Sequence, residues 1–243
     1  MYQAFWLAVQ FLTRLPTPSI GVATSRQVGI SVLFYPVVGL LIGCLLAVFS
    51  LLIHGLNQYL QAALVLVAWV FLTGGLHLDG LADCADAWAG GLGSKEQSLA
   101  IMKDPAAGPI AVIILILIIL VKWSALISIV NQQELEKLLA FPIMGRVSIL
   151  LLMLSTPYVR EKGLGETMSN NLPAQKAWGV VLVSLLISTW ILGFFAIALA
   201  CLLIWVLRRM ALLRLGGVTG DVYGAVLEMV EAASMVIAVW KFG

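Results

Sequence analysis

Residues 108–130 read GPIAVIILILIILVKWSALISIV, with Lys122 as their single charged residue. A helix rises 1.5 Å per residue and a bilayer core is about 30 Å thick, so about 20 apolar residues cross it. The chain as a whole is 62% hydrophobic and 11% charged, with a mean hydropathy of +1.06. Soluble domains are about 45–50% apolar and about 25% charged. These values predict an integral membrane protein. With a net charge of +2, they exclude a soluble globule, a disordered chain and a basic nucleic-acid-binding module.

Further apolar runs cover residues 30–53, 62–76, 138–158, 174–207 and 222–240. No run alternates between apolar and polar residues as the strands of a membrane barrel do. We therefore predict an all-α, polytopic membrane protein in which residues 1–243 form a single transmembrane catalytic domain. Residues 1–15 are apolar with polar breaks and end at Pro16, so a short interfacial or re-entrant helix is expected there.

The run 174–207 is too long for one span, and a break near Gly193 would give helices 174–192 and 194–210, about 28 and 25 Å long. Basic residues prefer cytoplasmic loops. With seven spans and a cytoplasmic N-terminus, ten basic residues lie inside and two outside, whereas six spans lower the contrast to 7 against 4 or more. The ten are Arg14, Arg26, Lys95, Lys103, Arg160, Lys162, Lys176, Arg208, Arg209 and Arg214, and the two are Lys137 and Lys241. This distribution favours about seven spans.

An aspartate cluster follows the second expected span, in TGGLHLDGLADCAD at residues 73–86. Asp79, Asp83 and Asp86 are spaced i, i+4 and i+7, which places them on one face of a helix. Three carboxylates without a basic residue among them repel one another and favour a bound cation. Oxygen ligands alone suit Mg²⁺, with Mn²⁺ as the alternative. A solvated helix end is the structural alternative, but the flanking residues are apolar or small.

A second acidic group, Asp221, Glu228 and Glu231, is spaced i, i+7 and i+10 and again shares one helical face. A Gly-rich stretch precedes this group, and four residues of the stretch are candidates for phosphate binding: Gly216, Gly217, Thr219 and Gly220. Backbone amides at a helix N-terminus bind anions well. A plain turn capped by Thr219 or Asp221 is the structural alternative. In the seven-span arrangement both acidic groups face the cytoplasm, where one active site can use both.

Three more residues have a structural and a functional interpretation. Lys103 either neutralises a substrate phosphate or pairs at the start of a helix. His77 either contacts substrate or packs as a hydrogen-bonded histidine. Arg146 lies within an apolar run, so it faces protein or water, where it either binds a substrate anion or pairs with an acid.

Five stretches carry a resemblance to a known family: FLTRLP at 11–16, YPVVGLLIG at 35–43, GGLHLDGLADCAD at 74–86, IMKD at 101–104 and GGVTGDVYGA at 216–225. The chain resembles the cobalamin synthases, or adenosylcobinamide-GDP ribazoletransferases, from residue 11 to about 231. The resemblance implies a Mg²⁺-dependent, multi-pass enzyme of the bacterial cytoplasmic (inner) membrane, with its active site facing the cytoplasm. Such an enzyme joins adenosylcobinamide-GDP to α-ribazole or its 5′-phosphate, giving adenosylcobalamin or its phosphate and GMP.

The reaction fits the acidic residues, because phosphoryl transfer is catalysed chiefly by positioning and charge neutralisation. The expected metal ligands are Asp79, Asp83, Asp86, Asp221 and Glu228. Asp86 is the expected general base, with Glu231 as its rival. The expected substrate and phosphate contacts are Arg14, His77, Lys103, Asp104, Arg146 and the four loop residues. The expected partners are the two small-molecule substrates and the lipid bilayer but no nucleic acid, together with a second copy of the chain or other enzymes of cobamide assembly.

Two other functions stay open at this point. A CDP-alcohol phosphotransferase also uses an aspartate-rich helix, but its motif continues Asp-Gly-x-x-Ala-Arg, whereas Asp83-Cys84 stands in the Ala-Arg place here. A cation or proton transporter would line its path with intramembrane acids. Such a transporter needs neither a Gly-rich loop nor three closely spaced aspartates.

Overall fold

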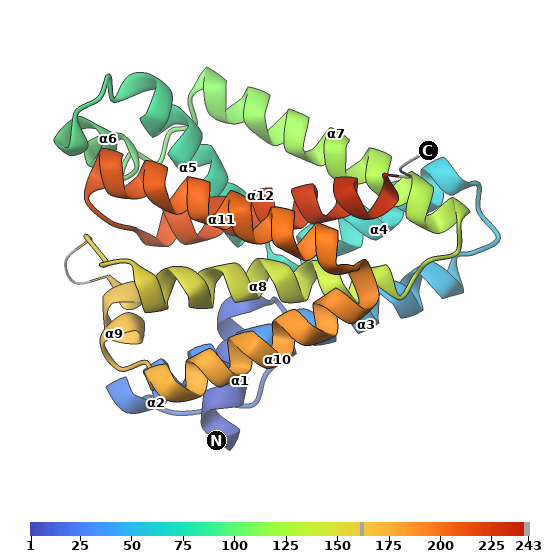
Figure 1. Ribbon diagram of the computed structural model, residues 1–243, viewed down its shortest axis with the longest axis horizontal. Helices are drawn as coiled ribbons and strands as arrows, with labels where there is room; N and C mark the ends of the chain where they lie inside the picture. The colour runs from blue at the N-terminus through green and yellow to red at the C-terminus, as the bar shows by residue number, and fades with distance from the viewer. Residues whose placement is uncertain (161–162, 241–243) are drawn as a thin grey trace.

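The structure is a computed structural model that describes residues 1–160 and 163–240, and it consists of helices that mostly run along one common axis (Figure 1). The elements are α1 Tyr2–Leu12, α2 Ser25–Ser31, the 3₁₀ helix η1 Val32–Phe34, α3 Tyr35–Leu52, α4 Gln58–Thr73, α5 Leu76–Gly90, α6 Lys95–Ile101, α7 Pro109–Asn131, α8 Lys137–Ser155, α9 Leu164–Asn170, α10 Ala174–Leu192, α11 Phe194–Leu215 and α12 Gly220–Val239. Within the described ranges no strand occurs, apart from one isolated bridge between Tyr158 and Val218. The predicted all-α class is confirmed.

Six segments of the described chain are long and apolar enough to cross a membrane. They are Ser25–Leu52, which joins α2 to α3, and the helices α7, α8, α10, α11 and α12. The predicted division of the run 174–207 is confirmed, since α10 ends at Leu192 and α11 begins at Phe194. Gly193 between them has φ +86°, a value that residues with a side chain rarely adopt.

The second expected span, residues 62–76, is not one straight helix. The helix α4 ends at Thr73, and the axis of α5 makes an angle of 88° with the axis of α4. Two consecutive glycines in the left-handed region, Gly74 at φ +65° and Gly75 at φ +70°, make the bend. Glycine adopts these values without the steric cost that a Cβ would bring. If α4 and α5 together cross the membrane as one broken span, the described chain has seven spans.

The aspartate cluster of α5 and the Gly-rich loop between α11 and α12 lie at the same end of the molecule (left in Figure 1). α8 and α11 end there, α7, α10 and α12 begin there, and the short helices α2, α6 and α9 surround them. The alternating helix directions therefore agree with the seven-span order. Lys162 and Lys241, two of the basic residues in the charge comparison, lie outside the described residues. The N-terminal helix α1 is a separate short helix packed against α2 and α3.

Candidate active site

The helices α5 and α12 touch at backbone distance, and this contact brings the two acidic motifs together. A Cβ built on Gly80 would lie 2.8 Å from the carbonyl oxygen of Asp221, and one on Gly224 would lie 3.0 Å from that of His77. Small residues on facing positions allow membrane helices to approach this closely. Asp221, in the first turn of α12, therefore lies directly beside the turn of α5 that carries Asp79 and Asp83.

Three carboxylates share this region, and they interact unfavourably. The negative charges of Asp221 and Asp79 both act on Asp83, which is half-buried. Arg160 makes the one ion pair that any of the three has among the described residues, with its Nη2 atom 3.0 Å from Oδ2 of Asp221. Asp79 is exposed, and its carboxylate makes no hydrogen bond or ion pair to another described residue. The single positive charge of Arg160 therefore neutralises only part of the negative charge of the three aspartates.

The donor set suits a hard divalent cation, although the side chains are not gathered as a preformed cage. Over residues 1–160 and 163–240, no group of three or more Asp, Glu, His or Cys side chains is arranged to hold a metal ion. Mg²⁺ typically binds one or two carboxylates and completes its shell with water and substrate phosphates. The aspartates therefore fit a Mg²⁺ that arrives with a phosphate-bearing substrate.

Asp86 has a different environment from the other aspartates of α5. Its Oδ2 accepts a hydrogen bond from the backbone N–H of Gly108 at 2.5 Å, and its Oδ1 accepts one from Ala111 at 3.0 Å. These donors belong to the N-terminus of α7, whose first amides have no partner inside the helix. Asp86 therefore fixes the start of α7 against α5, a role that differs from the expected one of metal ligand and general base.

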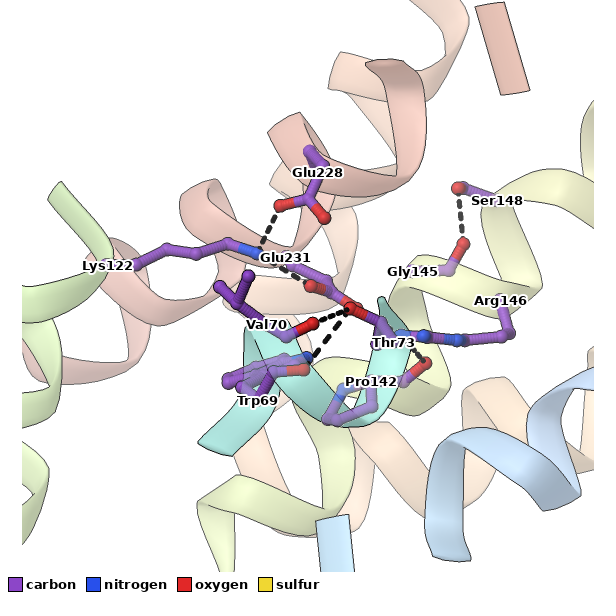
Figure 2. Close-up of polar contacts among 10 residues, drawn as sticks. All are labelled: Trp69, Val70, Thr73, Lys122, Pro142, Gly145, Arg146, Ser148, Glu228 and Glu231. Carbon is purple, nitrogen blue, oxygen red and sulfur yellow. Dashed lines mark hydrogen bonds and ion pairs between the residues drawn. The ribbon is translucent and has the colours of Figure 1, made fainter. Parts of the chain in front are cut away.

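Glu228 and Glu231 belong to a buried ion-pair cluster in the middle of the bundle (Figure 2). The Nζ atom of Lys122 lies 2.5 Å from Oε2 of Glu228 and 2.7 Å from Oε2 of Glu231. Arg146 pairs through Nη1 with Oε1 of Glu231. The ammonium of Lys122 also lies 4.9 Å from the ring centre of Trp69. Two cations and two anions thus neutralise one another and join α7, α8 and α12.

This placement differs from the sequence interpretation, in which Glu228 ligates the metal and Glu231 competes for the role of base. Seven residues of helix carry Glu228 about 10 Å beyond Asp221 along the axis of α12, so a shared face does not mean a shared centre. Of the two interpretations of Arg146, the structure gives the pairing with an acid, since its partner is Glu231.

The Gly-rich loop joins α11 to α12 and also binds the segment that follows α8, residues 157–160, through backbone hydrogen bonds. Gly216 ends α11 at φ +76°, and the hydroxyl of Thr219 caps α12 by accepting a hydrogen bond from the N–H of Val222. Val218 exchanges backbone hydrogen bonds of 2.9 Å with Pro157 and Val159. The capping interpretation is therefore correct for Thr219, and the loop positions residues 157–160 beside Asp221.

Three further predicted residues make no hydrogen bond or ion pair to the described side chains of Asp79, Asp83 and Asp221. Lys103 and Asp104 are exposed in the turn after α6, where Oδ1 of Asp104 accepts a hydrogen bond from the N–H of Ala106 at 2.9 Å. Arg14 lies at the bend between α4 and α5, where its side chain covers Gly74. Asp104 therefore stabilises the turn in which it lies. Arg14 packs against the junction between α4 and α5.

A cavity of about 250 Å³ opens between the two acidic motifs. Asp79, Asp221, Arg160 and Gly220 line it, as do His77 and a group of aromatic side chains. Tyr158 and Tyr223 stack there with ring centres 6.0 Å apart. Burial raises the pKa of the Tyr158 phenol, so this group stays a neutral hydrogen-bond donor at physiological pH.

Arg160, Tyr158 and Tyr223 were not among the residues singled out from the sequence. A signal existed for two of them, since Tyr223 lies inside the motif GGVTGDVYGA and Arg160 is the first basic residue after α8. A second cavity, of about 580 Å³, lies across α5 and α12 and is bounded by α7 and α11. The described side chains that line it are apolar or small, and none of them is charged.

Comparisons with known proteins identify the family. The profile of the family described as cobalamin-5-phosphate synthase matches residues 4–239. The chain belongs to this family. A protein of Pseudomonas fluorescens (strain Pf-5) named adenosylcobinamide-GDP ribazoletransferase is 48% identical over 232 residues, covering 94% of this chain and 96% of the relative. Proteins of the same name from Pseudomonas putida (strain F1) and Stutzerimonas stutzeri are each 48% identical, over 94% and 95% of this chain.

No solved structure gives a significant match to the fold. The relatives are transferases by name, and they match nearly the whole chain. This cobalamin-5-phosphate synthase family member is therefore an enzyme of the transferase class, as the sequence predicted. Its helices make it a multi-pass membrane protein, which is also the predicted class.

Proposed function

We propose that this enzyme transfers the adenosylcobinamide-phosphate group of adenosylcobinamide-GDP to a free ribose hydroxyl of α-ribazole or of its 5′-phosphate, releasing GMP. The observation that carries the proposal is that Asp79 and Asp221, from motifs far apart in sequence, line one cavity together with Arg160. Asp83 lies close enough to feel the charges of both aspartates. The names of the relatives supply the substrates. A diphosphate is bound by cations. The aspartates can bind a metal ion, and Arg160 can bind a phosphate directly.

Asp79, Asp83 and Asp221 would hold Mg²⁺ together with the diphosphate. When bound, the ion supplies Lewis-acid stabilisation of the phosphate oxygens and of the GMP leaving group. Arg160 would exchange its bond to Asp221 for a bond to a phosphate, because a guanidinium binds both groups with the same planar fork. The geometry favours Asp79 as the acceptor of the hydroxyl proton, since this residue lines the cavity and its carboxylate makes no hydrogen bond or ion pair to another described residue, whereas Asp221 pairs with Arg160. Asp86 and Glu231 already have partners.

The test of this function is an assay of the purified enzyme in detergent with adenosylcobinamide-GDP, α-ribazole and Mg²⁺. We expect GMP release only when both substrates are present, with complete loss on adding EDTA and recovery on adding excess Mg²⁺. The physical reason is that the clustered carboxylates repel the diphosphate unless a cation lies between them. No GMP release, combined with ion flux in proteoliposomes without nucleotide, would support the transporter instead.

We further propose that the end of the bundle carrying the two acidic motifs faces the cytoplasm of a bacterial inner membrane. The distribution of basic residues supports this orientation. In a variant without native cysteines, a membrane-impermeant thiol reagent added from outside should label Gly55→Cys, at the opposite end, and spare Glu96→Cys on α6. Gly55 has open space around it, so the new side chain causes no clash. The reverse labelling would contradict the orientation.

A further inference from the structure

The residues that line the cavity beside the aspartates form two groups, one charged and one aromatic or apolar. The residues of each group contact one another. Asp221 pairs with Arg160 and accepts a hydrogen bond from Thr219. Among the other lining residues, Phe11 stacks on Tyr35 with ring centres 6.2 Å apart, and the Tyr35 hydroxyl contacts the sulfur of Met168 at 3.3 Å. One part of the wall is therefore charged, and the other is aromatic and apolar.

Three buried polar atoms of the lining residues have no hydrogen-bond partner: Nδ1 of His77, the hydroxyl oxygen of Tyr223 and Nε of Arg160. His77 and Tyr223 are only 4% and 5% exposed. Buried polar groups are nearly always paired in folded proteins, so unpaired ones on residues that line a cavity point to a polar ligand. The Tyr35 hydroxyl differs, because its contact is with the sulfur of Met168.

The volume of about 250 Å³ is just below the usual range of about 300–1,000 Å³ for ligand pockets, so the cavity has room for one nucleoside at most. The corrin ring system of the donor is far larger and has to lie elsewhere. Two nucleosides take part in the proposed reaction, guanosine and α-ribazole. Guanine carries several polar groups on its edge that need partners, whereas the dimethylbenzimidazole base of α-ribazole is an apolar bicyclic ring with no hydrogen-bond donor.

We propose that this cavity is the acceptor site and binds α-ribazole, an inference that rests on the proposed function. The base lies among Phe11, Tyr35 and Met168, where aromatic rings and a thioether suit an apolar aromatic ligand. The ribose hydroxyls pair with Nδ1 of His77 and the hydroxyl of Tyr223. The ribose hydroxyl that attacks the phosphorus then points to the charged wall. Phe11, Tyr35 and Tyr223 are accordingly specificity-determining residues for the acceptor.

Calorimetric titration of the purified protein with α-ribazole alone tests the site without turnover. We expect Tyr223→Phe to weaken binding about 3- to 10-fold, the usual effect of one lost neutral hydrogen bond. Phe11→Leu should weaken binding at least about 3-fold, because it removes a ring and keeps an apolar side chain. Tyr59→Phe, the same chemical change at the start of α4, should leave the affinity unchanged within about 2-fold.

Unchanged affinity in both Tyr223→Phe and Phe11→Leu would overturn the acceptor site. Displacement of α-ribazole by guanosine, with guanosine affinity lowered by the same two substitutions, would assign the cavity to the donor nucleotide and also overturn it. Binding as expected without GMP release in the enzyme assay would leave the site standing and contradict the proposed reaction. GMP release with a KM for α-ribazole that neither substitution raises would contradict the site alone.

Discussion

Asn in place of Asp83 is expected to lower the turnover number by about 100-fold or more, and Asp79→Asn should do the same. Both changes keep the size of the side chain and remove its charge. Loss of residues that merely orient metal ligands costs 10- to 100-fold, so loss of a group that itself holds the ion should cost at least as much. The mutual repulsion of Asp83 with Asp79 and Asp221 is the reason to expect a cation between them. GMP release at saturating substrate is the measurement.

Asp104→Asn is the matched control. Asp104 is an exposed aspartate in the turn after α6, with its hydrogen bond in its own turn, so we expect activity within about 2-fold of the unchanged enzyme. Thermal unfolding should show that Asp79→Asn and Asp83→Asn keep the fold, since removing one of several repelling charges does not weaken a folded state. Near-normal turnover in both variants would refute the metal site.

The second large effect is on stability, because Glu231→Gln should destabilise the protein by about 3–5 kcal/mol. Glu231 is the carboxylate shared by Lys122 and Arg146, and its side chain is fully buried. Neutralising it leaves two buried cations with Glu228 as the remaining anion. For a protein of this size, a loss of that order lowers the melting temperature by roughly 10 °C. Thermal unfolding in one fixed detergent measures the shift.

Glu134→Gln makes the same chemical change in a different environment. Its pair with Lys137, at 2.6 Å, is partly exposed at a helix end. Such pairs contribute at most about 1 kcal/mol, so the melting temperature should change little. Equal shifts for Glu134→Gln and Glu231→Gln would show that the buried cluster contributes no more than a surface pair.

The helical class and the division at Gly193 were predictable because they depend on local properties, namely run length, hydropathy and the absence of a side chain. The 88° bend between α4 and α5 was not predicted. The sequence Gly74-Gly75 signals such a turn, but the angle depends on how Arg14 and the neighbouring helices pack against it. The contact of α5 with α12 at Gly80 is likewise a tertiary property.

The candidate site was predictable in part. The helical spacing grouped Asp79 with Asp83, and their meeting with Asp221 is visible only in the folded chain. Helical periodicity gives the face of a residue and not its distance along the axis, which is why Glu228 was assigned to the metal.

The intramembrane cations carried a signal that was used only for Arg146, for which pairing with an acid was one of two interpretations. Lys122 and Arg146 inside apolar runs needed buried acids as partners, and the acids of the last helix provide them. Counting charges within the spans, and not only between them, would have separated these acids from the aspartates.

The buried ion-pair cluster also constrains the order in which the protein assembles during synthesis. Lys122 and Arg146 leave the ribosome early, on α7 and α8, whereas their carboxylate partners are on α12, the last helix of the described chain. A lone charge at the middle of a membrane helix costs about 2.5–3.5 kcal/mol on insertion. Until α12 arrives, α7 and α8 must therefore keep these charges hydrated or sheltered by the insertion machinery. The central bundle can close only after the C-terminal helix has been made.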